Sequence, residues 1–525
     1  MRAGMMKNNT SDETIEGTAF SPGAKSFACA ASIAAVLLCG CNVGPKYVKP
    51  MAPTPPEFKE SSPAAYNNAP TAGVWQPAQP QDAALKGKWW EVFNEPELNA
   101  LEDQLDINNQ NIVASFQNFM AARAQVSEAK SQFYPTATVG PSFNRVKTPA
   151  ALHGAAASGA AGVTSSELAL PFDVSWEPDL WGKIRNTVRE FQYAAQVSAA
   201  DLENERLTEQ ADLAEAYFEL RGEDSLQNLF DKTVAADQKS LDLTKALRDT
   251  GIDNDEAVAE AEVTLENAQE TATGIATNRA IFEHAIAMLI GKPASSFSMP
   301  VKGLTTPVPP IPVGVPSQLL ERRPDIAGAE RTMAEANAVI GVEKAAYYPT
   351  LDLTGAGGLE SSTIGKLFSA PALFWSAGAS ASETIFDAGL RKATVAQFTA
   401  AYNSDVASYR QTVLGAFQQV EDFIATLRVT SQQIQQEDTA VKSAQRFVDI
   451  AQSRYDTGLD PYLDVITAQT TLLSDQQTQI TLRVSEMTAA VELVQALGGG
   501  WDTTKLPAAD KVTTNGAVQQ VSKTQ

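Results

Sequence analysis

The chain contains the same helix-breaking sequence twice, and each copy has long helical sequence on both sides. The first copy is Leu247–Asp253, which contains Gly251, and the second is Arg454–Asp464, which contains Gly458 and Pro461. Glycine tolerates the left-handed backbone conformation that ends many helices, and proline suits the first turn of a helix. Each copy therefore predicts the tip of a helical hairpin, and two hairpins predict a duplicated fold.

Other landmarks repeat in the same order around the two tips. Asn108–Pro135 aligns without a gap with Arg322–Pro349, and both end in Tyr-Pro. An extended stretch, a long helical stretch, a tip and a shorter helical stretch follow each of them. The spacing is far too long for a solenoid repeat, so one unit that has been duplicated and fused is the simpler interpretation.

The extended stretches alternate apolar and polar residues over about ten positions, which is the pattern of a strand that faces lipid on one side. Four strands are predicted, at about 136–145, 166–176, 350–360 and 374–384. Four strands cannot close on themselves, so spanning a bilayer requires several copies of the chain, with eight or twelve strands in total. The alternative is a half-buried sheet in a soluble protein.

The predicted long helices, Asp179–Asp249 and Asp387–Asp456, have about 70 residues each, or on the order of 105 Å at 1.5 Å per residue. Apolar residues recur along them at spacings of three, four and seven, which predicts coiled-coil packing. The returning helices, Asn254–Ile290 and Pro461–Leu497, are about half as long. We therefore expect two further helices, at 96–133 and 324–347, to pack beside the remaining halves.

Charge and cysteine content exclude several classes of function. The formal net charge of −22 makes a nucleic-acid partner unfavourable. All three cysteines precede residue 42, which leaves the rest of the chain without disulfides or thiolate metal clusters, and His153 and His284 stand alone. The sequence contains no metal cluster, nucleophile–base pair or phosphate loop, so we expect no enzyme activity and no cofactor.

The N-terminus explains the cysteines. Lys25 precedes the apolar run Phe27–Leu38, which suits the core of a signal peptide over residues 1–40, and the run leads to Cys41. This segment resembles a bacterial lipobox, which implies that Cys41 becomes the new N-terminus and carries N-acyl and S-diacylglycerol lipid. Asn42 is not the aspartate associated with retention in the inner membrane, which favours the outer membrane. The alternative is a plain secretory signal with a chance cysteine.

The remaining segments complete the predicted organisation. A proline-rich extended linker covers 41–85, and the Trp89-Trp90 pair that follows is interpreted as a packing anchor. The first repeat covers 86–291, an equatorial crossover covers 292–316, the second repeat covers 317–501, and a disordered tail covers 502–525. The fold class is mainly α with a transmembrane β part and internal duplication.

Several motifs in this order resemble one family, the TolC-like outer membrane efflux proteins, and within it the lipoprotein branch of OprM and NodT. They are Cys41–Tyr47 followed by Pro50, Leu319–Ile326, Phe386–Gly389 and Tyr462–Val465. The resemblance implies a homotrimer with a 12-strand barrel in the outer membrane and a helical tunnel in the periplasm. It also implies docking to a periplasmic adaptor protein and to an inner-membrane pump of the RND type.

The resemblance also implies candidate site residues. Asp464 matches a family carboxylate at the narrow periplasmic entrance, and Asp460 and Tyr462 complete the candidate gate. A second family carboxylate is replaced here by Thr467, and Asp460 stands where some members have arginine, so the lock of those members is not preserved. Asp464 is equally compatible with a solvated helix surface. The residues expected to dock the adaptor are those of the two tips: Thr250, Gly251, Ile252, Thr457, Gly458 and Leu459.

The function most consistent with these features is a passive exit duct that carries small molecules or drugs from the pump to the cell exterior. One alternative is the same duct serving type I-like protein or polysaccharide secretion. A third hypothesis is a coiled-coil envelope lipoprotein that forms no channel.

Overall fold

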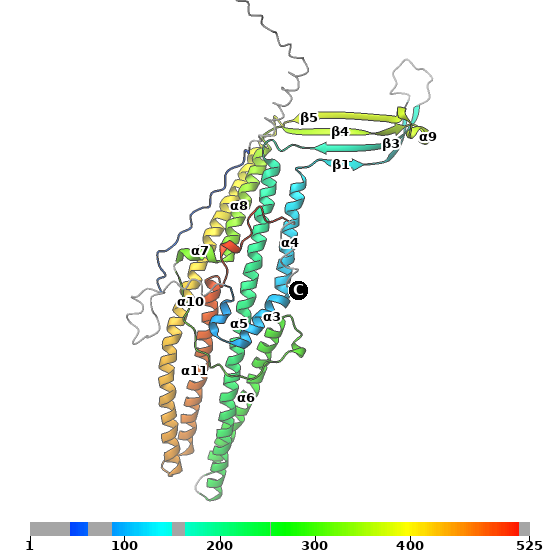
Figure 1. The fold of residues 1–525 in the computed structure, drawn as a ribbon. Helices are drawn as coiled ribbons and strands as arrows, with labels where there is room; N and C mark the ends of the chain where they lie inside the picture. The colour runs from blue at the N-terminus through cyan, green and yellow to red at the C-terminus, as the bar shows by residue number, and fades with distance from the viewer. Residues whose placement is uncertain (1–41, 61–86, 150–162, 252–253, 315, 514–525) are drawn as a thin grey trace, which may run out of the picture. The chain divides into compact units, whose positions relative to one another are not determined.

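The computed structural model describes residues 42–60, 87–149, 163–251, 254–314 and 316–513 (Figure 1). Cys41 and Ile252, two of the predicted site residues, lie outside these ranges. The chain divides into two units. The sheet unit comprises the described residues up to Pro45, Gln132–Asn186 and Gly341–Arg391, and the helical unit comprises Lys46–Ser131, Thr187–Ile340 and the residues from Lys392 onward.

The sheet unit contains one antiparallel sheet with the strand order β1-β3-β4-β5, in which β2 also pairs with β3. The strands are β1 (Thr136–Val139), β2 (Ser142–Thr148), β3 (Val163–Trp176), β4 (Thr350–Ser361) and β5 (Leu373–Ser382). A short helix, α9 (Ile364–Leu367), and the 3-10 turn η5 (Ala370–Ala372) connect β4 to β5. The extended stretches of both repeats therefore meet in one sheet, where β3 pairs with β4.

The first predicted strand, 136–145, is interrupted, which corrects the expectation of one continuous element. Val139 pairs with Phe172 and Ser142 pairs with Ala169, so β1 and β2 keep one register along β3 across the gap between them. The gap contains Pro141 and lies opposite Pro171. Proline has no backbone N–H to donate, so the ladder is broken there although the chain direction is kept.

Two helices of 67 residues, α5 (Lys183–Asp249) and α10 (Leu390–Asp456), match the predicted long helices. Both begin in the same way. The Asp179 carboxylate accepts hydrogen bonds from the backbone N–H groups of Ile184 and Arg185, and the Asp387 carboxylate accepts them from Gly389 and Arg391. Each carboxylate also pairs with the arginine side chain of its own turn. This repeated N-terminal cap is local evidence of the duplication.

The returning helices, α6 (Asp255–Leu289) and α11 (Tyr462–Ala496), have 35 residues each and match the predicted hairpins. Residues of the predicted apolar stripe of α10, among them Val413, Val420 and Leu427, are buried. Two further helices are α7 (Leu319–Arg322) and α8 (Pro324–Ala345), and short 3-10 turns η3 (Ala294–Ser296) and η4 (Pro316–Gln318) lie in the crossover region.

The helix predicted at 96–133 is two helices, α3 (Pro96–Asn108) and α4 (Gln110–Ser131), which corrects the sequence-based expectation. Asn109 between them has an extended backbone. Its Oδ1 accepts hydrogen bonds from the N–H groups of Asn111 and Ile112, and its Nδ2 donates to Glu209 at 2.6 Å. The side chain therefore caps α4 and ties the break to α5.

A large apolar core joins α3, α5, α6, α8, α10 and α11 in the helical unit. The 3-10 turn η1 (Trp89–Phe93) contributes both tryptophans to it, with Trp89 1% and Trp90 2% exposed. The Trp89 Nε1–H donates to Gln210 on α5. The interpretation of this aromatic pair as a packing anchor agrees with its burial.

The predicted linker 41–85 is not wholly outside the core. Phe58 is 1% exposed and packs against Phe417, with 6.4 Å between the ring centroids. The backbone N–H groups of Lys59 and Glu60 donate to the Glu421 carboxylate, and Glu60 pairs with Arg428 at 2.6 Å. A single aromatic anchor and three polar contacts thus fasten this stretch to α10.

Residues 502–513 of the tail expected to be disordered are ordered. It contains the 3-10 turn η6 (Thr503–Lys505), and Val512 is fully buried in a cluster with Val126 and Ala195. The backbone carbonyl of Thr513 accepts a hydrogen bond from Arg123. The order comes from these contacts with other segments, which the polar composition of the tail does not indicate.

Candidate functional site: a two-faced sheet and two hairpin tips

The register of the sheet collects most of the apolar residues of the strands on one face. Cross-strand partners point to the same side, and the pairs include Val139 with Phe172, Trp176 with Leu353, and Leu359 with Leu373. The opposite face carries Thr, Ser, Asn, Asp and Glu residues, for example in the pair of Asp173 with Ala356 and that of Asp352 with Ser380. The sheet is therefore two-faced over most of its length. The exceptions are Val146 of β2 and Phe374 of β5, which lie on the polar face, and Arg145 and Lys147 of β2, which lie on the apolar face.

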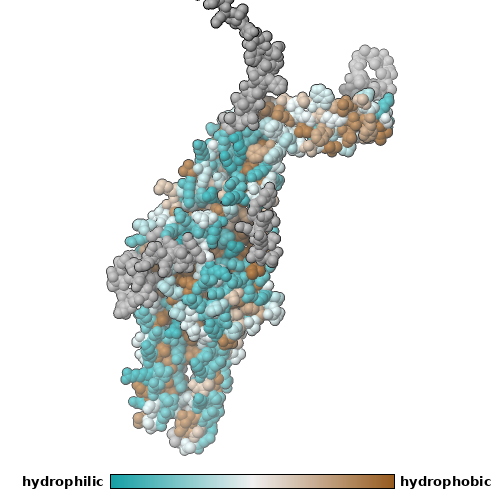
Figure 2. Space-filling view, in the orientation of Figure 1, coloured by the Kyte–Doolittle hydropathy of each residue, from teal (hydrophilic) through white to brown (hydrophobic). Residues whose placement is uncertain are grey.

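The apolar face is open to its surroundings in the isolated chain. Phe172 is 50% exposed and Trp375 is 79% exposed, and Figure 2 shows hydrophobic residues gathered over the strands. Soluble monomeric proteins rarely leave so continuous an apolar surface uncovered. The alternation that predicted lipid-facing strands is therefore present in the structure as an apolar face over most of the sheet.

Both hairpin tips have the backbone geometry that the sequence predicts. Gly251 has φ 76° and Gly458 has φ 70°, in the left-handed region that favours glycine. After α10, the Gly458 N–H donates to the Tyr455 carbonyl at 2.8 Å and the Leu459 N–H donates to the Arg454 carbonyl at 2.9 Å, which closes the last turn. Leu459 is 71% exposed, so the tip presents an apolar side chain at its surface.

Threonines stabilise the ends of both outgoing helices. The Thr250 hydroxyl donates to the Leu247 carbonyl at 2.9 Å, and the Thr457 hydroxyl donates to the Arg454 carbonyl at 3.0 Å. In the first tip the side chain of Asn254 then caps α6 by accepting from the Ala257 N–H. The predicted docking residues that the structure describes are thus all hydrogen-bonded to the last turn of the outgoing helix.

The three gate candidates have different environments. Asp460 pairs with Arg454 of the same tip, and this pairing lowers the pKa of Asp460 and raises that of Arg454. Asp464, in the first turn of α11, is exposed and adds to the negative charge that acts on Arg454. Tyr462 is buried, with 4% exposure, and burial raises its pKa. Only Asp464 of the three presents an exposed carboxylate outside an ion pair with Arg454.

Tyr462 belongs to an apolar cluster that joins all four hairpin helices near the tips. Its ring lies 5.3 Å from that of Tyr455, and Ser240 on α5 is its hydrogen-bond partner. Val465 and Ala468 of α11 are fully buried in the same cluster, together with Leu241, Ala261 and Leu265 of the first hairpin. Tyr462 thus couples the second hairpin to the first.

Sequence reasoning missed a buried ion-pair network at the base of the first hairpin. Arg221 is 1% exposed and pairs with Asp224 at 3.0 Å and with Glu97 at 2.6 Å. Arg279 on α6 pairs with Asp224 at 2.7 Å and donates to the Met299 carbonyl of the crossover. Arg221 and Asp224 are three residues apart on α5, but Glu97 and Arg279 lie far from them in the sequence, and no local pattern marks those two as partners.

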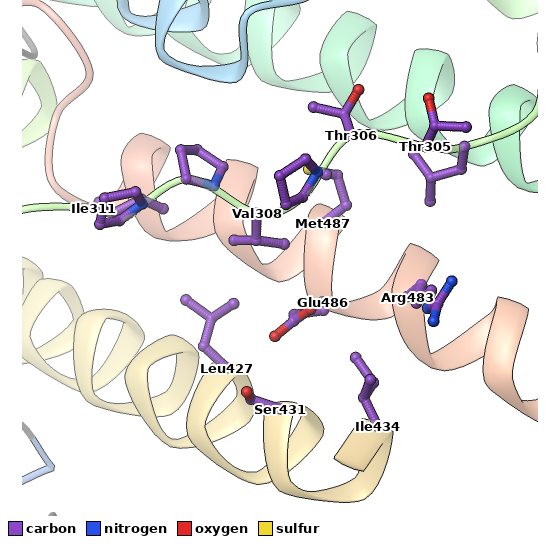
Figure 3. A pocket seen from close by; sticks show the side chains of 14 residues that line it. Thr305, Thr306, Val308, Ile311, Leu427, Ser431, Ile434, Arg483, Glu486 and Met487 are labelled. Carbon is purple, nitrogen blue, oxygen red and sulfur yellow. The ribbon is translucent and has the colours of Figure 1, made fainter. Parts of the chain in front are cut away.

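A cavity of about 420 Å³ lies in the helical unit between the crossover, α10 and α11. Figure 3 shows the side chains of Val308, Leu427 and Met487 around it, with Glu486 beside Ser431. Burial raises the pKa of Glu486. Within the described ranges, no cluster of His, Cys, Asp or Glu could hold a metal ion, and no helix is long and apolar enough to cross a bilayer.

Residues 101–292 and 315–499 match the family model described as outer membrane efflux protein. The chain belongs to this family. TtgC, named a probable efflux pump outer membrane protein of Pseudomonas putida, is 29% identical over 90% of this chain and 95% of its own length. SepC from the same species is 30% identical, covering 89% of this chain and 95% of its own length, and OprJ from Pseudomonas aeruginosa is 29% identical, covering 91% and 96%.

Solved structures show the same fold. The outer membrane channel OprN matches with a TM-score of 0.78 and 26% identity, covering 88% of this chain and all of that one. The CmeC channel of Campylobacter jejuni matches with a TM-score of 0.80 and 22% identity, covering 90% and 97%. The predictions of family, fold class, outer membrane location and efflux channel function are therefore confirmed.

Proposed function

We propose that this outer membrane efflux protein assembles as a homotrimer and acts as the passive exit duct of a tripartite system, without catalysis. The two-faced sheet is the observation that supports this most directly. Within the described residues, β1 with β2 forms one edge of the sheet and β5 forms the other. In lipid, unpaired backbone groups at such edges are costly, so each edge is satisfied by the neighbouring copy. Because β1 and β2 follow one register along β3, they count as one strand, so each copy supplies four strands and three copies supply twelve.

The two tips are the proposed docking elements for a periplasmic adaptor. The described residues of both tips are hydrogen-bonded to the last turn of the outgoing helix, and the exposed Leu459 offers an apolar contact at the end of the second hairpin. An inner-membrane pump of the RND type would deliver cargo through this adaptor. Relatives are named for efflux of antibiotics, toluene and solvents, so we assign small, largely apolar organic molecules as cargo.

The proposed gate is a ring of Asp464 carboxylates, one from each of three chains. Its exposure and its position in the first turn of α11 support this role. Asp460 supports the ring indirectly because its pairing with Arg454 fixes the turn before α11. Tyr462 supports it by holding α11 against the first hairpin.

Lipidation at Cys41 is part of the proposal, and the lipid is the one non-protein group that we assign to the chain. Radiolabelled palmitate should enter the wild-type protein, and Cys41→Ser should abolish the labelling. Because the sheet also inserts, the substitution should lower the yield of channel without eliminating it. Labelling that survives in Cys41→Ser would refute this assignment.

The exit-duct proposal is tested by deleting the gene and measuring growth in the presence of apolar antibiotics and solvents. We expect the deletion to sensitise cells and the wild-type gene to restore resistance. A plasmid-borne Trp375→Asp variant, which places a charge on the apolar face, should fail to restore resistance, whereas Ser376→Asp on the opposite face should succeed. Equal failure or equal success of the two variants would contradict the assignment of the faces.

A further inference from the structure

The first residues of the described chain are held firmly in the sheet unit. The Asn42 Oδ1 accepts hydrogen bonds from the Gly44 N–H at 3.1 Å and from the Asn186 Nδ2 at 3.0 Å. The Val43 N–H donates to the Trp181 carbonyl at 3.3 Å. We call Asn42–Gly44 the anchor segment. Its backbone and its one polar side chain are both bonded to residues around the start of α5.

Three glycines from separate parts of the sequence make room for this arrangement. A Cβ on Gly44 would lie 2.9 Å from the Gly341 Cα, and a Cβ on Gly341 would lie 2.6 Å from the Asn186 Nδ2. Gly182 has φ 85°, and a Cβ there would lie 2.9 Å from the Asn42 Oδ1. Such distances are below normal contact, so the anchor segment fits a site that any side chain at these positions would disturb.

The partners of the anchor segment are connected to the sheet itself. The Trp181 ring stacks on Tyr348 with 4.8 Å between the centroids, and its Nε1–H donates to the Pro349 carbonyl at 2.8 Å, directly before β4. The guanidinium of Arg391 lies over the ring of the neighbouring Tyr347, with 5.2 Å between the Arg391 Cζ and the ring centroid. The anchor segment is thus fixed to the end of the sheet at which β4 begins.

This end of the sheet carries exposed apolar and aromatic residues. Ile385 is 93% exposed and Phe386 is 86% exposed, in the segment that follows β5, and Tyr134 before β1 is 72% exposed. Because neighbouring strands are antiparallel, the end of β5 and the starts of β1 and β4 lie at the same end of the sheet. Aromatic residues at strand ends mark the boundary between lipid and water in membrane sheets.

We propose that the anchor segment is a clamp that positions the lipid anchor at this boundary. The inference rests on lipidation at Cys41, which lies one residue before Asn42, or about 3.8 Å of backbone. The acyl chains then enter the membrane beside the strand ends instead of at the end of a free tether. Asn42 accordingly has a structural role in the mature protein, separate from any effect on sorting.

A glycine pair in one helix provides a matched test. Gly341→Ala should displace the anchor segment, whereas Gly328→Ala, also in α8, adds a Cβ at an ordinary 3.5 Å from the Ala200 Cβ. Both changes replace a helical glycine by alanine, so any effect of helix propensity is shared. Asn186→Ala is a third variant, which removes a hydrogen bond without adding bulk.

The readout is the rate at which maleimide modifies a reporter, Val43→Cys, in membranes. Cys29 and Cys39 are removed with the signal peptide, and a lipidated Cys41 has no free thiol. We expect slow modification in the reporter alone and with Gly328→Ala, and modification that is severalfold faster with Gly341→Ala and with Asn186→Ala. Palmitate labelling should be equal in all four proteins, and the yield of SDS-resistant trimer should fall in the two clamp variants.

The possible failures are distinguishable. Fast modification in the reporter alone, with normal palmitate labelling, would overturn the clamp while leaving lipidation intact. Absent palmitate labelling, with slow modification, would overturn lipidation and with it the role of the clamp in positioning a lipid. Equal rates in Gly341→Ala and Gly328→Ala, together with no change in Asn186→Ala, would also overturn the proposal.

Discussion

Replacing Gly458 by valine tests whether the second tip is the docking element. Gly458 has φ 70°, and a Cβ built there would meet no atom within 4 Å. Glycine is therefore favoured at this position by the backbone conformation alone and not by a lack of space. A left-handed conformation costs a residue with a Cβ about 1–2 kcal/mol, and a β-branched residue is the least suited to it. We therefore expect the native turn to lose roughly tenfold in population relative to competing turns, since 1.4 kcal/mol is a factor of ten.

The loss should stay local. The turn is closed by the Gly458 N–H and Leu459 N–H hydrogen bonds, whereas the helices on either side are held by the packing of Tyr455 against Tyr462. Gly458→Val should consequently lower drug resistance and weaken chemical crosslinking to the adaptor, while the abundance of trimer in the outer membrane stays near normal. Gly458→Asn is the matched control, because asparagine tolerates the left-handed region.

Resistance should be measured as the minimal inhibitory concentration of an effluxed drug, with trimer quantified by immunoblot of unheated membranes. Full resistance in Gly458→Val would refute the claim that the conformation of this tip matters for docking. Equal loss in Gly458→Asn would refute the argument from backbone geometry and point to the absence of a side chain as the requirement.

Three further changes test other parts of the molecule. Asp464→Asn should reduce cation selectivity in planar bilayers and weaken block by divalent cations added from the periplasmic side, because a ring of like charges is removed; unchanged selectivity and block would exclude Asp464 from the constriction. Arg221→Ala leaves the fully buried Asp224 carboxylate with one arginine instead of two and should lower the free energy of unfolding by about 3 kcal/mol in denaturant titrations of purified protein, whereas a loss below about 1 kcal/mol would show that the network contributes little. Burial, with the charge of Glu492 nearby, raises the pKa of Glu215 from 4.5 to about 7, so the folded state binds more protons than the unfolded state between these values and loses stability as pH rises through them. Glu215→Gln should therefore raise the Tm more at pH 8 than at pH 4.5, and a gain that does not depend on pH would contradict this.

Features that depend on residues close together in the sequence were predictable. The tips were found because glycine and proline break helices in a position-specific way, and the structure gives Gly251 and Gly458 the expected positive φ. The long helices followed from apolar spacing, and both end at the predicted residues, Asp249 and Asp456. The strands followed from alternation, which survives in the register of the sheet.

Features that depend on distant partners were not predictable. The break between α3 and α4 at Asn109 involves no proline or glycine there. It depends on a hydrogen bond from the Asn109 side chain to Glu209 on α5. Phe58 and Val512 are single buried anchors in segments whose overall composition suggests no order. The burial of Tyr462 likewise depends on packing against α5 and α6, which the motif around it does not encode.

If copies of this chain join their sheet edges, they enclose one water-filled passage. Single-channel recording of purified, SDS-resistant oligomers in planar lipid bilayers measures assembly and pore together. We expect one class of cation-selective conductance that appears with the trimer and disappears when the sample is heated to monomer before reconstitution. Trimer that inserts into the bilayer without conducting, or conductance that persists in heat-dissociated monomer, would contradict this proposal.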